Sequence, residues 1–224
     1  MQRELAAERR TTLEPDSTAA TADDRPFPEL LATDRLVLER ACRQNVAPLE
    51  FYRIRSSDDG VEAVTEYLPW GPDESPRETA DLLDRFGREW KNGTVARYFV
   101  RPRATEPDAG ALAGVAKLEV DRIRETGSLG IWLRKRFWGR GYSGERAGVL
   151  LELAFDRLNL EIVEVVHQDG NDRSQRAVER YVETYGGGYQ GRLRNWRTDG
   201  DDVVDAHRYT ITAAEYADAV DDRR

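Results

Sequence analysis

Glycines set among arginines in the middle of the chain could hold a phosphate group. The segment from Arg134 to Ala147, RKRFWGRGYSGERA, places Gly139, Gly141 and Gly144 within a basic run. Glycine lets backbone N–H groups converge on a ligand without an intervening side chain, and the N-terminus of a helix adds partial positive charge. The segment therefore predicts that backbone amides and neighbouring guanidinium groups bind a phosphate or diphosphate.

A strand before this turn and a helix after it would position the amides. Residues Ser128–Leu133 (SLGIWL) form an apolar, strand-like segment that ends directly before the basic run. Beyond the turn, apolar residues recur at the spacing of one helix face: Ala147, Leu150, Leu151, Ala154 and Leu158. The order strand, glycine turn, helix is typical of phosphate-binding segments.

The glycines fit two cofactor-binding patterns. Gly139, Gly141 and Gly144 match G-x-G-x-x-G, which is typical of dinucleotide-binding proteins, whereas Arg136, Gly139 and Gly141 match [Q/R]-x-x-G-x-[G/A]. A dinucleotide fold places an apolar parallel strand directly before the first glycine, early in a repeated βαβ series. Here a basic spacer precedes the glycine and the motif lies mid-chain, which favours the second pattern. A nicotinamide cofactor remains an alternative, because Glu161 or Glu164 lies near the distance expected for a ribose-binding acid.

The other predicted elements form a mixed α/β domain with a largely antiparallel sheet flanked by helices. Ser75 to Glu78 is a capping box with Pro76 at the first helical position, so a helix is expected to begin there. A second helix is expected from Ser174 to Tyr185. Further strands are expected at Ala96–Val100, Leu112–Val120, Ile162–His167, Tyr189–Trp196 and Val203–Ile211.

The chain is acidic overall. Its 224 residues include 42 Asp and Glu against 34 Lys and Arg, a formal net charge of -8, and 39% hydrophobic residues. This apolar content suffices for one core, and we expect a single domain from residue 27 to 224 behind a polar extension of residues 1–26, whose first ten residues could form a short helix. A net-acidic surface disfavours nucleic acid and anionic membranes as partners.

Targeting signals and metal ligands are not evident in the sequence. No apolar run approaches membrane-spanning length and the N-terminus is too polar for a signal peptide, so we expect a cytoplasmic protein. Cys42 stands alone, and His167 and His207 lie far apart in the chain. We therefore expect neither a disulfide within the chain nor a metal site.

Features beyond the turn resemble those of one enzyme superfamily. Asn171-Asp-Arg-Ser174 follows the next predicted strand. Three further segments lie before and after it in the chain: Thr33–Leu38, Leu129–Leu133 and Tyr189–Arg194. With the glycine turn, these features resemble the GNAT superfamily of N-acetyltransferases, and most of all its RimJ/RimL branch. That branch acetylates N-terminal amines of ribosomal proteins and, in relatives, other small amines. The resemblance covers roughly Ala32 to Tyr216 and implies a sheet whose central strands splay apart.

The resemblance implies that acetyl-CoA is the co-substrate and that a primary amine attacks its thioester directly, without a metal. The resemblance implies that these residues bind acetyl-CoA: Leu133, Arg134, Arg136, Trp138, Gly139, Arg140, Gly141, Tyr142, Ser143, Asn171 and Ser174. A backbone N–H such as that of Leu133 would stabilise the oxyanion. Asn171 would bond the pantetheine arm or act as a turn residue. Ser174 would protonate the leaving thiolate or cap the second helix.

The sequence offers several candidates for the proton transfers and the acceptor pocket. Glu119 is a candidate base acting through water, or else a solvated strand residue, and Tyr185 is a candidate acid. The glutamate base that some members of the branch carry would align near Arg197, so it is missing here. Tyr67 and Trp70 would line the acceptor pocket or belong to the aromatic core.

The expected function is therefore acetyl transfer to a primary amine, with a protein N-terminal α-amine favoured over a small amine. The missing glutamate keeps open an acyl-CoA-binding module without catalysis, and the glycine pattern keeps open a nicotinamide-dependent oxidoreductase. A homodimer would fit the branch.

Overall fold

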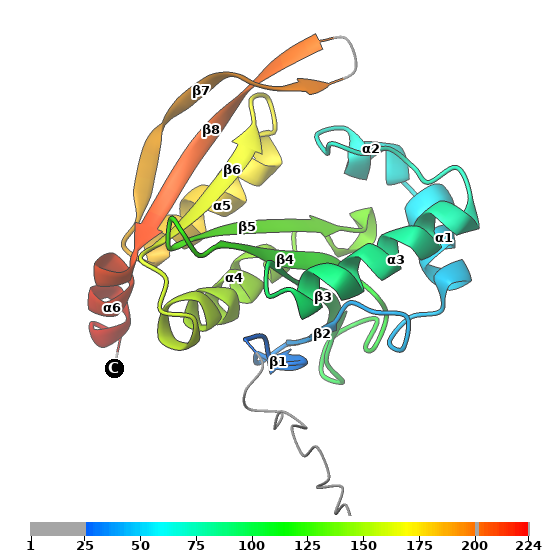
Figure 1. Cartoon of the computed structure of the whole chain (residues 1–224), viewed down its shortest axis with the longest axis horizontal. Helices are drawn as coiled ribbons and strands as arrows, with labels where there is room; N and C mark the ends of the chain where they lie inside the picture. Colours follow the sequence, from blue (N-terminus) through cyan, green and yellow to red (C-terminus); the bar gives the residue numbers. More distant parts are fainter. Residues whose placement is uncertain (1–25, 200–201, 224) are drawn as a thin grey trace, which may run out of the picture.

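The structure, a computed structural model, describes residues 26–199 and 202–223. The described residues form an eight-stranded sheet in the order β1-β2-β3-β4-β5-β6-β8-β7 (Figure 1). Neighbouring strands pair antiparallel except β5 and β6, which pair parallel. The expected mixed fold, a largely antiparallel sheet flanked by helices, is confirmed.

The strands are β1 (Leu30–Ala32), β2 (Leu36–Arg40), β3 (Val95–Pro102), β4 (Gly114–Asp121), β5 (Thr126–Leu133), β6 (Ile162–Gln168), β7 (Gly188–Asp199) and β8 (Asp202–Thr212). The α-helices are α1 (Pro48–Ser57), α2 (Val61–Thr65), α3 (Pro76–Lys91), α4 (Tyr142–Glu152), α5 (Asp172–Thr184) and α6 (Ala213–Asp221). A 3-10 turn, η1 (Lys135–Phe137), precedes α4, and a π-helical turn, η2 (Leu153–Arg157), follows it. None of these helices is both long and apolar enough to cross a membrane.

The parallel pair at the centre of the sheet is incomplete. Its pairing runs from Thr126 opposite Ile162 to Leu129 opposite Val165 and stops there. Beyond that point β5 continues along β4 as far as Leu133, while β6 continues along β8. The two strands therefore separate, and the sheet opens at their carboxyl ends.

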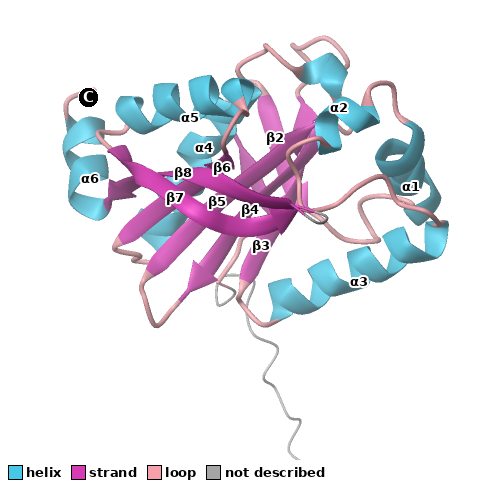
Figure 2. Ribbon diagram, turned by 90° about the horizontal axis from the view of Figure 1, so that it is seen from above, coloured by secondary structure: helices cyan, strands magenta, loops and turns pink. Residues whose placement is uncertain are grey.

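Helices cover both faces of the sheet, with α4 and α5 on one side and α3 on the other (Figure 2). The first side forms the larger core, in which Leu118, Leu129 and Val163 pack against α4 and α5. The second side forms a smaller core in which Phe99 and Val115 pack under α1 and α3. This second core lies over β3, β4 and β5. The part of the same face that lies near the opening, from β4 across to β8, is less covered.

Local sequence signals explain most element boundaries. Ser75 caps α3 by accepting from the Glu78 N–H, as predicted, although the Glu78 carboxylate bonds the Glu74 N–H instead of completing the box. The second long helix begins two residues earlier than predicted, because Asn171 and not Ser174 is its N-cap. The predicted helix through Leu158 changes to π-helical geometry after Glu152.

The sequence did not predict β1 or α2, and β7 and β8 are longer than expected. The turn between β7 and β8 and the possible helix in the first ten residues lie outside the described residues.

Candidate functional site

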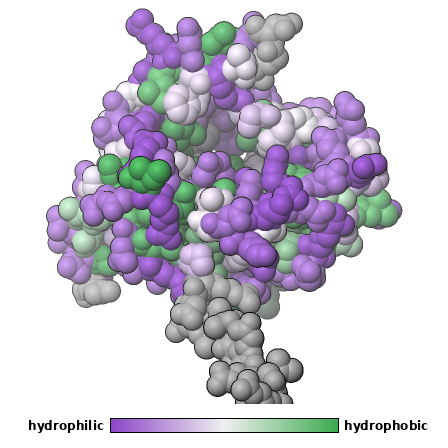
Figure 3. All heavy atoms as spheres, viewed as in Figure 1, coloured by the Kyte–Doolittle hydropathy of each residue, from purple (hydrophilic) through white to green (hydrophobic). Residues whose placement is uncertain are grey.

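A cavity of about 1340 Å³ lies where β5 and β6 separate, and it passes through the sheet. On the side of α4 and α5 its walls include Ser143, Asn171 and Ser174. On the other side they include Glu119 of β4 and Trp70 of the loop before α3. Figure 3 shows the surface hollowed between the β7–β8 hairpin and the part of the chain that carries α2 and α3. A molecule in this cavity can thus be held from both faces of the sheet.

The glycine turn presents unused backbone donors at one end of this cavity. Gly139 and Gly141 have positive φ angles of 77° and 80°, and Gly141 is the N-cap of α4 without a capping side chain. Within the described residues, no hydrogen bond engages the backbone N–H groups of residues 139–143, although the Trp138 N–H bonds the Lys135 carbonyl. A Cβ atom added to Gly139 would meet nothing within 4 Å, so its surface is open. Free amides at a helix N-terminus are suited to bind an anion.

The arginines of the turn have different environments. Arg134 is largely buried and forms a bidentate pair with Asp58, so its guanidinium anchors the turn to the segment after α1. Arg140 bonds Asp108 at 2.9 Å, while Arg136 lies 3.7 Å from the same carboxylate. Arg136 and Arg140 remain partly exposed beside the free amides, whereas Arg134 does not.

Aromatic residues fix the position of the turn. The Trp138 indole N–H donates to the Leu133 carbonyl at 2.8 Å, and Arg173 stacks 3.7 Å over the Trp138 ring. Tyr142 is 1% exposed, and its hydroxyl donates to Glu106 at 2.8 Å. Leu133 ends β5 just outside the cavity lining, which includes Gly130 to Trp132 of the same strand.

Asn171 and Ser174 face the cavity from the start of α5. The Asn171 side-chain oxygen accepts from the Ser174 N–H at 3.0 Å, so Asn171 performs the capping role that the sequence allowed for Ser174. The Ser174 hydroxyl has no hydrogen bond within the described residues and lines the cavity. This hydroxyl is therefore available to a ligand.

A row of polar side chains crosses the sheet on the opposite face. Glu119 pairs with Ser128, and Ser128 pairs with Glu164, in adjacent strands β4, β5 and β6. The Ser128 hydroxyl donates to Glu164 Oε1 at 2.8 Å, and Arg208 holds Glu164 Oε2 at 2.8 Å. Glu119 is about half exposed and pairs with Lys117 at 2.9 Å. The row places two carboxylates on the cavity floor.

Sequence reasoning missed Ser128 and Glu164 as partners in one site. Glu164 was considered only as a ribose-binding acid, although an acidic residue inside the apolar strand Ile162–Gln168 was a usable signal. Strand pattern shows which face a residue occupies but not which residue lies beside it in the next strand.

Tyr181 of α5 and Tyr185, the C-cap of that helix, lie in different places. Tyr185 is not among the residues that line the cavity, and its ring stacks on Tyr216 at 5.9 Å with Arg223 over it at 4.6 Å. The structure therefore does not bring Tyr185 together with the other predicted site residues. Tyr181 lines the cavity but is 3% exposed and belongs to the core.

Arg146 of α4 is a site residue that the sequence analysis did not single out. Its side chain lines the cavity and is 1% exposed. Arg146 lies four residues before Leu150 on the apolar stripe of the helix, so a charge at a core position was the available signal.

Aromatic and ionic contacts form the wall opposite α5. Arg55 and Asp73 are both buried and make a bidentate ion pair at 2.8 and 2.6 Å, and Trp70 lies 3.8 Å over the Arg55 guanidinium. Tyr67 and Trp70 line the cavity, as the pocket interpretation predicts. Arg197 of β7 donates to the Tyr67 carbonyl at 3.2 Å and to Gln168 Oε1 at 2.5 Å, which bridges the opening.

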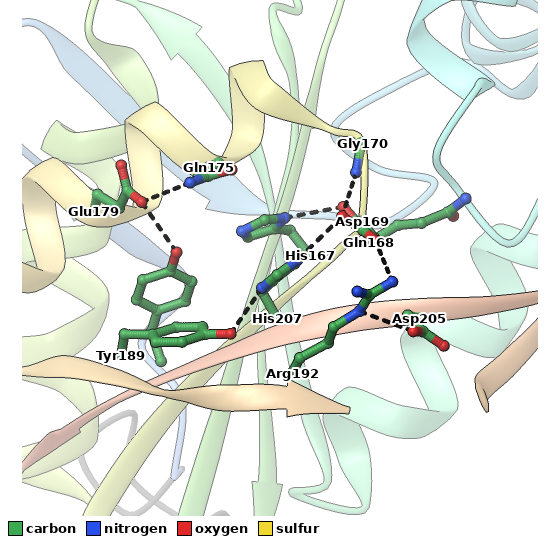
Figure 4. A network of polar contacts seen from close by, with 11 residues as sticks. His167, Gln168, Asp169, Gly170, Gln175, Glu179, Tyr189, Arg192, Asp205 and His207 are labelled. Carbon is green, nitrogen blue, oxygen red and sulfur yellow. Dashed lines mark hydrogen bonds and ion pairs between the residues drawn. The ribbon is translucent and has the colours of Figure 1, made fainter. Parts of the chain in front are cut away.

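The histidines belong to a network between α5 and the β7–β8 hairpin (Figure 4), and His167, unlike His207, also lines the cavity. His207 contacts the Tyr189 hydroxyl at 2.9 Å and Asp169 at 3.2 Å, and Asp169 also pairs with Arg192 at 2.8 Å. His167 is buried, and burial lowers its pKa below the ordinary value. In the described part of the chain, His, Cys, Asp and Glu side chains form no group of three that could hold a metal ion.

A known domain family matches the part of the chain that carries the glycine turn, Asn171 and Ser174. The sequence profile of the family described as "Acetyltransferase (GNAT) domain" matches residues 35–181, more than half of the chain. Among curated proteins, no sequence matches this chain.

Solved structures with the same fold include three acetyltransferases. A GCN5-related N-acetyltransferase from Brucella melitensis is 19% identical, with a TM-score of 0.71 over 87% of this chain and 83% of that one. An enzyme from Salmonella typhimurium that modifies the N-terminal serine of ribosomal protein L7/L12 is 17% identical, with a TM-score of 0.68 over 82% and 99%. The microcin C7 self-immunity acetyltransferase MccE, in complex with acetyl-CoA and AMP, is 16% identical, with a TM-score of 0.70 over 84% and 98%.

Proposed function

This chain belongs to the acetyltransferase (GNAT) domain family, and from that premise we propose that it transfers the acetyl group of acetyl-CoA to a primary amine. The observation that carries the proposal is the row of free backbone N–H groups at residues 139–143, which ends at Ser143 in the lining of the cavity between β5 and β6. An anion-binding turn beside a slot through a sheet suits an elongated ligand with a phosphate end and a reactive end.

The residues around the slot fit such a ligand. The amides of residues 139–143 and the side chains of Arg136 and Arg140 would bind the diphosphate, and the edge of β5 that β6 leaves free would bond the pantetheine. Buried polar groups of the cavity lining that lack hydrogen-bond partners among the described residues include the Arg146 guanidinium, the Tyr181 hydroxyl and His167 Nε2. When bound, acetyl-CoA supplies an activated thioester whose thiolate is a good leaving group.

The carboxylates on the opposite face would receive the amine. An ammonium ion is attracted to Glu119 and Glu164, and it must lose a proton before it can attack. Glu119 is open to water, so it can pass that proton to solvent, whereas Glu164 is held by Ser128 and Arg208 and would orient the ammonium. We assign Glu119 to proton removal through water and Glu164 to acceptor binding.

Backbone N–H and hydroxyl donors would stabilise the two negative charges that form in the reaction, on the oxyanion and on the leaving sulfur. Because N–H groups alternate along a strand, at least one within Gly130–Trp132 points to the free edge of β5 and can stabilise the oxyanion. These residues line the cavity, so they replace Leu133 in that role. Ser174 would donate to the leaving sulfur. Tyr185 receives no catalytic role, because its ring packs outside the cavity.

A protein N-terminal α-amine is the acceptor class that we favour. The cavity volume of about 1340 Å³ exceeds the roughly 300–1,000 Å³ of a usual small-molecule pocket. Acetyl-CoA would take part of this volume, and the acidic floor with Glu119 and Glu164 suits the cationic N-terminus of a polypeptide in the remainder. The Salmonella enzyme that modifies an N-terminal serine shares this fold, which supports the same class.

One observation favours an acyl-CoA-binding module without catalysis. Arg197 holds Tyr67 and Gln168 at the place where some members of the resembling branch carry a glutamate base. The nicotinamide alternative has less support, because β5 and β6 form one parallel unit between antiparallel neighbours and not a repeated parallel series.

A transfer assay separates these functions. The purified protein is incubated with acetyl-CoA and peptides that carry free or blocked N-termini, a polyamine or an aminoglycoside, and products are identified by mass spectrometry. We expect acetylation of free N-termini and none of blocked peptides without lysine. Binding of acetyl-CoA without transfer to any amine would support the binding module, and stabilisation by NAD but not by acetyl-CoA would overturn the proposal.

A further inference from the structure

Arg146 is a buried cation without an anionic partner. It is 1% exposed, and its Nε and Nη1 atoms make no hydrogen bond within the described residues. The group beside it is Tyr181, whose ring centre lies 5.7 Å from the guanidinium carbon and whose hydroxyl is also buried and unbonded. Burial lowers the pKa of Arg146, against the weaker opposite effect of Tyr181.

Such an arrangement is unfavourable unless something completes it. Removing a guanidinium from water costs more than a neighbouring phenol can return, so buried arginines are normally paired with carboxylates. The other arginine that is buried among the described residues, Arg55, follows this rule through its bidentate pair with Asp73. Arg146 differs, and the space that it borders is the cavity.

The direction of its side chain places Arg146 near the helix N-terminus. Side chains on an α-helix tilt toward the N-terminal end and cover the preceding turn. Arg146 lies three residues after Ser143, on the same side of α4, and both residues line the cavity. An anion bound at the free amides of residues 139–143 therefore lies on the side toward which the guanidinium extends.

We propose that Arg146, with the Tyr181 hydroxyl beside it, binds the diphosphate of CoA from inside the fold. This inference rests on the proposed function, and it adds a buried side-chain cation to the backbone amides of the turn. Binding then satisfies a charge that is unpaired in the free protein. Ligand affinity and the stability of the free protein thus respond in opposite directions when the charge is removed.

The test compares Arg146→Met with Arg180→Met. Arg180 is an exposed arginine of the neighbouring helix α5 that lies outside the cavity lining, so its replacement removes the same charge elsewhere. Calorimetry measures the dissociation constants of acetyl-CoA and of S-acetylpantetheine, which lacks the diphosphate. Thermal unfolding without ligand measures the stability of each variant.

We expect Arg146→Met to weaken acetyl-CoA binding about 10-fold to 100-fold, as for loss of a hydrogen-bonded charge, and to leave S-acetylpantetheine binding within about 2-fold. Its melting temperature without ligand should exceed that of the wild type, and Arg180→Met should match the wild type throughout. Arg146→Lys should recover part of the affinity for acetyl-CoA.

Unchanged acetyl-CoA affinity in Arg146→Met would overturn the inference while leaving the proposed function intact. An equal loss of affinity for acetyl-CoA and for S-acetylpantetheine would also overturn it, because the arginine would then contact the pantetheine or acyl part. If Arg146→Met does not fold, Arg146→Lys is compared with the wild type instead. The same criterion applies: its affinity for acetyl-CoA should fall while its affinity for S-acetylpantetheine stays unchanged. A wild-type protein that binds neither carrier would instead contradict the proposed function itself.

Discussion

The hydroxyl of Ser128 donates to Glu164 Oε1 at 2.8 Å across the parallel pair β5–β6, one residue before the two strands separate. Arg208 holds the second oxygen of Glu164 at 2.8 Å. The carboxylate is therefore fixed at the point where the sheet opens, and its side chain is only 15% exposed. A fixed, largely buried carboxylate there is suited to orient a cationic group.

Replacing Glu164 should impair acceptor binding more than donor binding. Glu164→Gln removes the negative charge but preserves the size and one hydrogen-bond acceptor. We expect the KM for the amine to rise about 10-fold, as for loss of one charge-assisted contact, with the dissociation constant of acetyl-CoA within 2-fold of the wild type. Glu62→Gln on α2, outside the cavity lining, is the control and should behave as the wild type. An unchanged KM for the amine would argue against the assignment.

A negative charge at the glycine turn should prevent donor binding. Gly141→Glu places a carboxylate beside the amides that would hold the diphosphate, in a backbone conformation with φ of 80°. Gly93→Glu, where φ is 68° at the end of α3, introduces the same residue and similar strain away from the cavity. Calorimetry should detect no acetyl-CoA binding to the first variant and normal binding to the second. Normal affinity in both would exclude the turn as the binding site.

The fold around this turn was largely predictable because its signals are local. The apolar run of Ser128–Leu133, the glycines and the helical spacing after Ala147 each act within a few residues, and the structure has β5, the turn and α4 there. Their relation to Glu164 was not predictable from spacing, because it depends on which strands become neighbours and where their pairing ends.

Ser174 and Asn171 should separate catalysis from stability. Ser174→Ala removes a hydroxyl without hydrogen bonds in the described structure, so we expect a lower kcat with unchanged stability toward urea. Asn171→Ala removes the cap of α5 and should cost about 1 kcal/mol of unfolding free energy. A stability loss in Ser174→Ala, or none in Asn171→Ala, would contradict the capping geometry. Unchanged turnover in Ser174→Ala would remove its role at the sulfur.

The buried ion pair between Arg55 and Asp73, in the cavity wall opposite α5, should contribute to the stability of the folded protein. Both groups are buried, so Asp73→Asn leaves the guanidinium without its partner, and we expect a loss of roughly 3–5 kcal/mol in urea unfolding. Asp84→Asn breaks a similar bidentate pair with Arg43 on the surface and should change stability little. An equal loss of unfolding free energy in the two variants would show that burial does not determine how much an ion pair contributes to stability.

Stability should fall at mildly acidic pH through His167. Burial lowers its pKa below the ordinary 6.5, so the unfolded chain binds the proton more readily than the folded protein. Its contribution is complete above about pH 7 and is lost as the pH falls below about 6.5 and through the lowered pKa of His167 in the folded protein. His167→Phe keeps the stacking on His207 and Tyr209 but cannot titrate. Urea unfolding between pH 5 and 8, approximately the range in which histidine titrates, should show a shallower loss in the variant than in the wild type.

Long-range contacts explain what the sequence did not predict in the site. Arg197 reaches the Tyr67 carbonyl across most of the chain, and no local pattern connects these two positions. Tyr185 is a candidate acid only through the resemblance, because other members of the superfamily carry a tyrosine acid on the corresponding helix, yet its place beyond the last turn of α5 puts it against Tyr216. Asn171 and Ser174 are both good capping residues, and only the start of α5 decides between them.

A crystal structure with bound CoA would decide whether the glycine turn holds the donor. We expect the diphosphate on the amides of residues 139–143 and the pantetheine in the opening between β5 and β6, with the sulfur near Ser174. CoA bound elsewhere, with that turn and opening unoccupied, would contradict it.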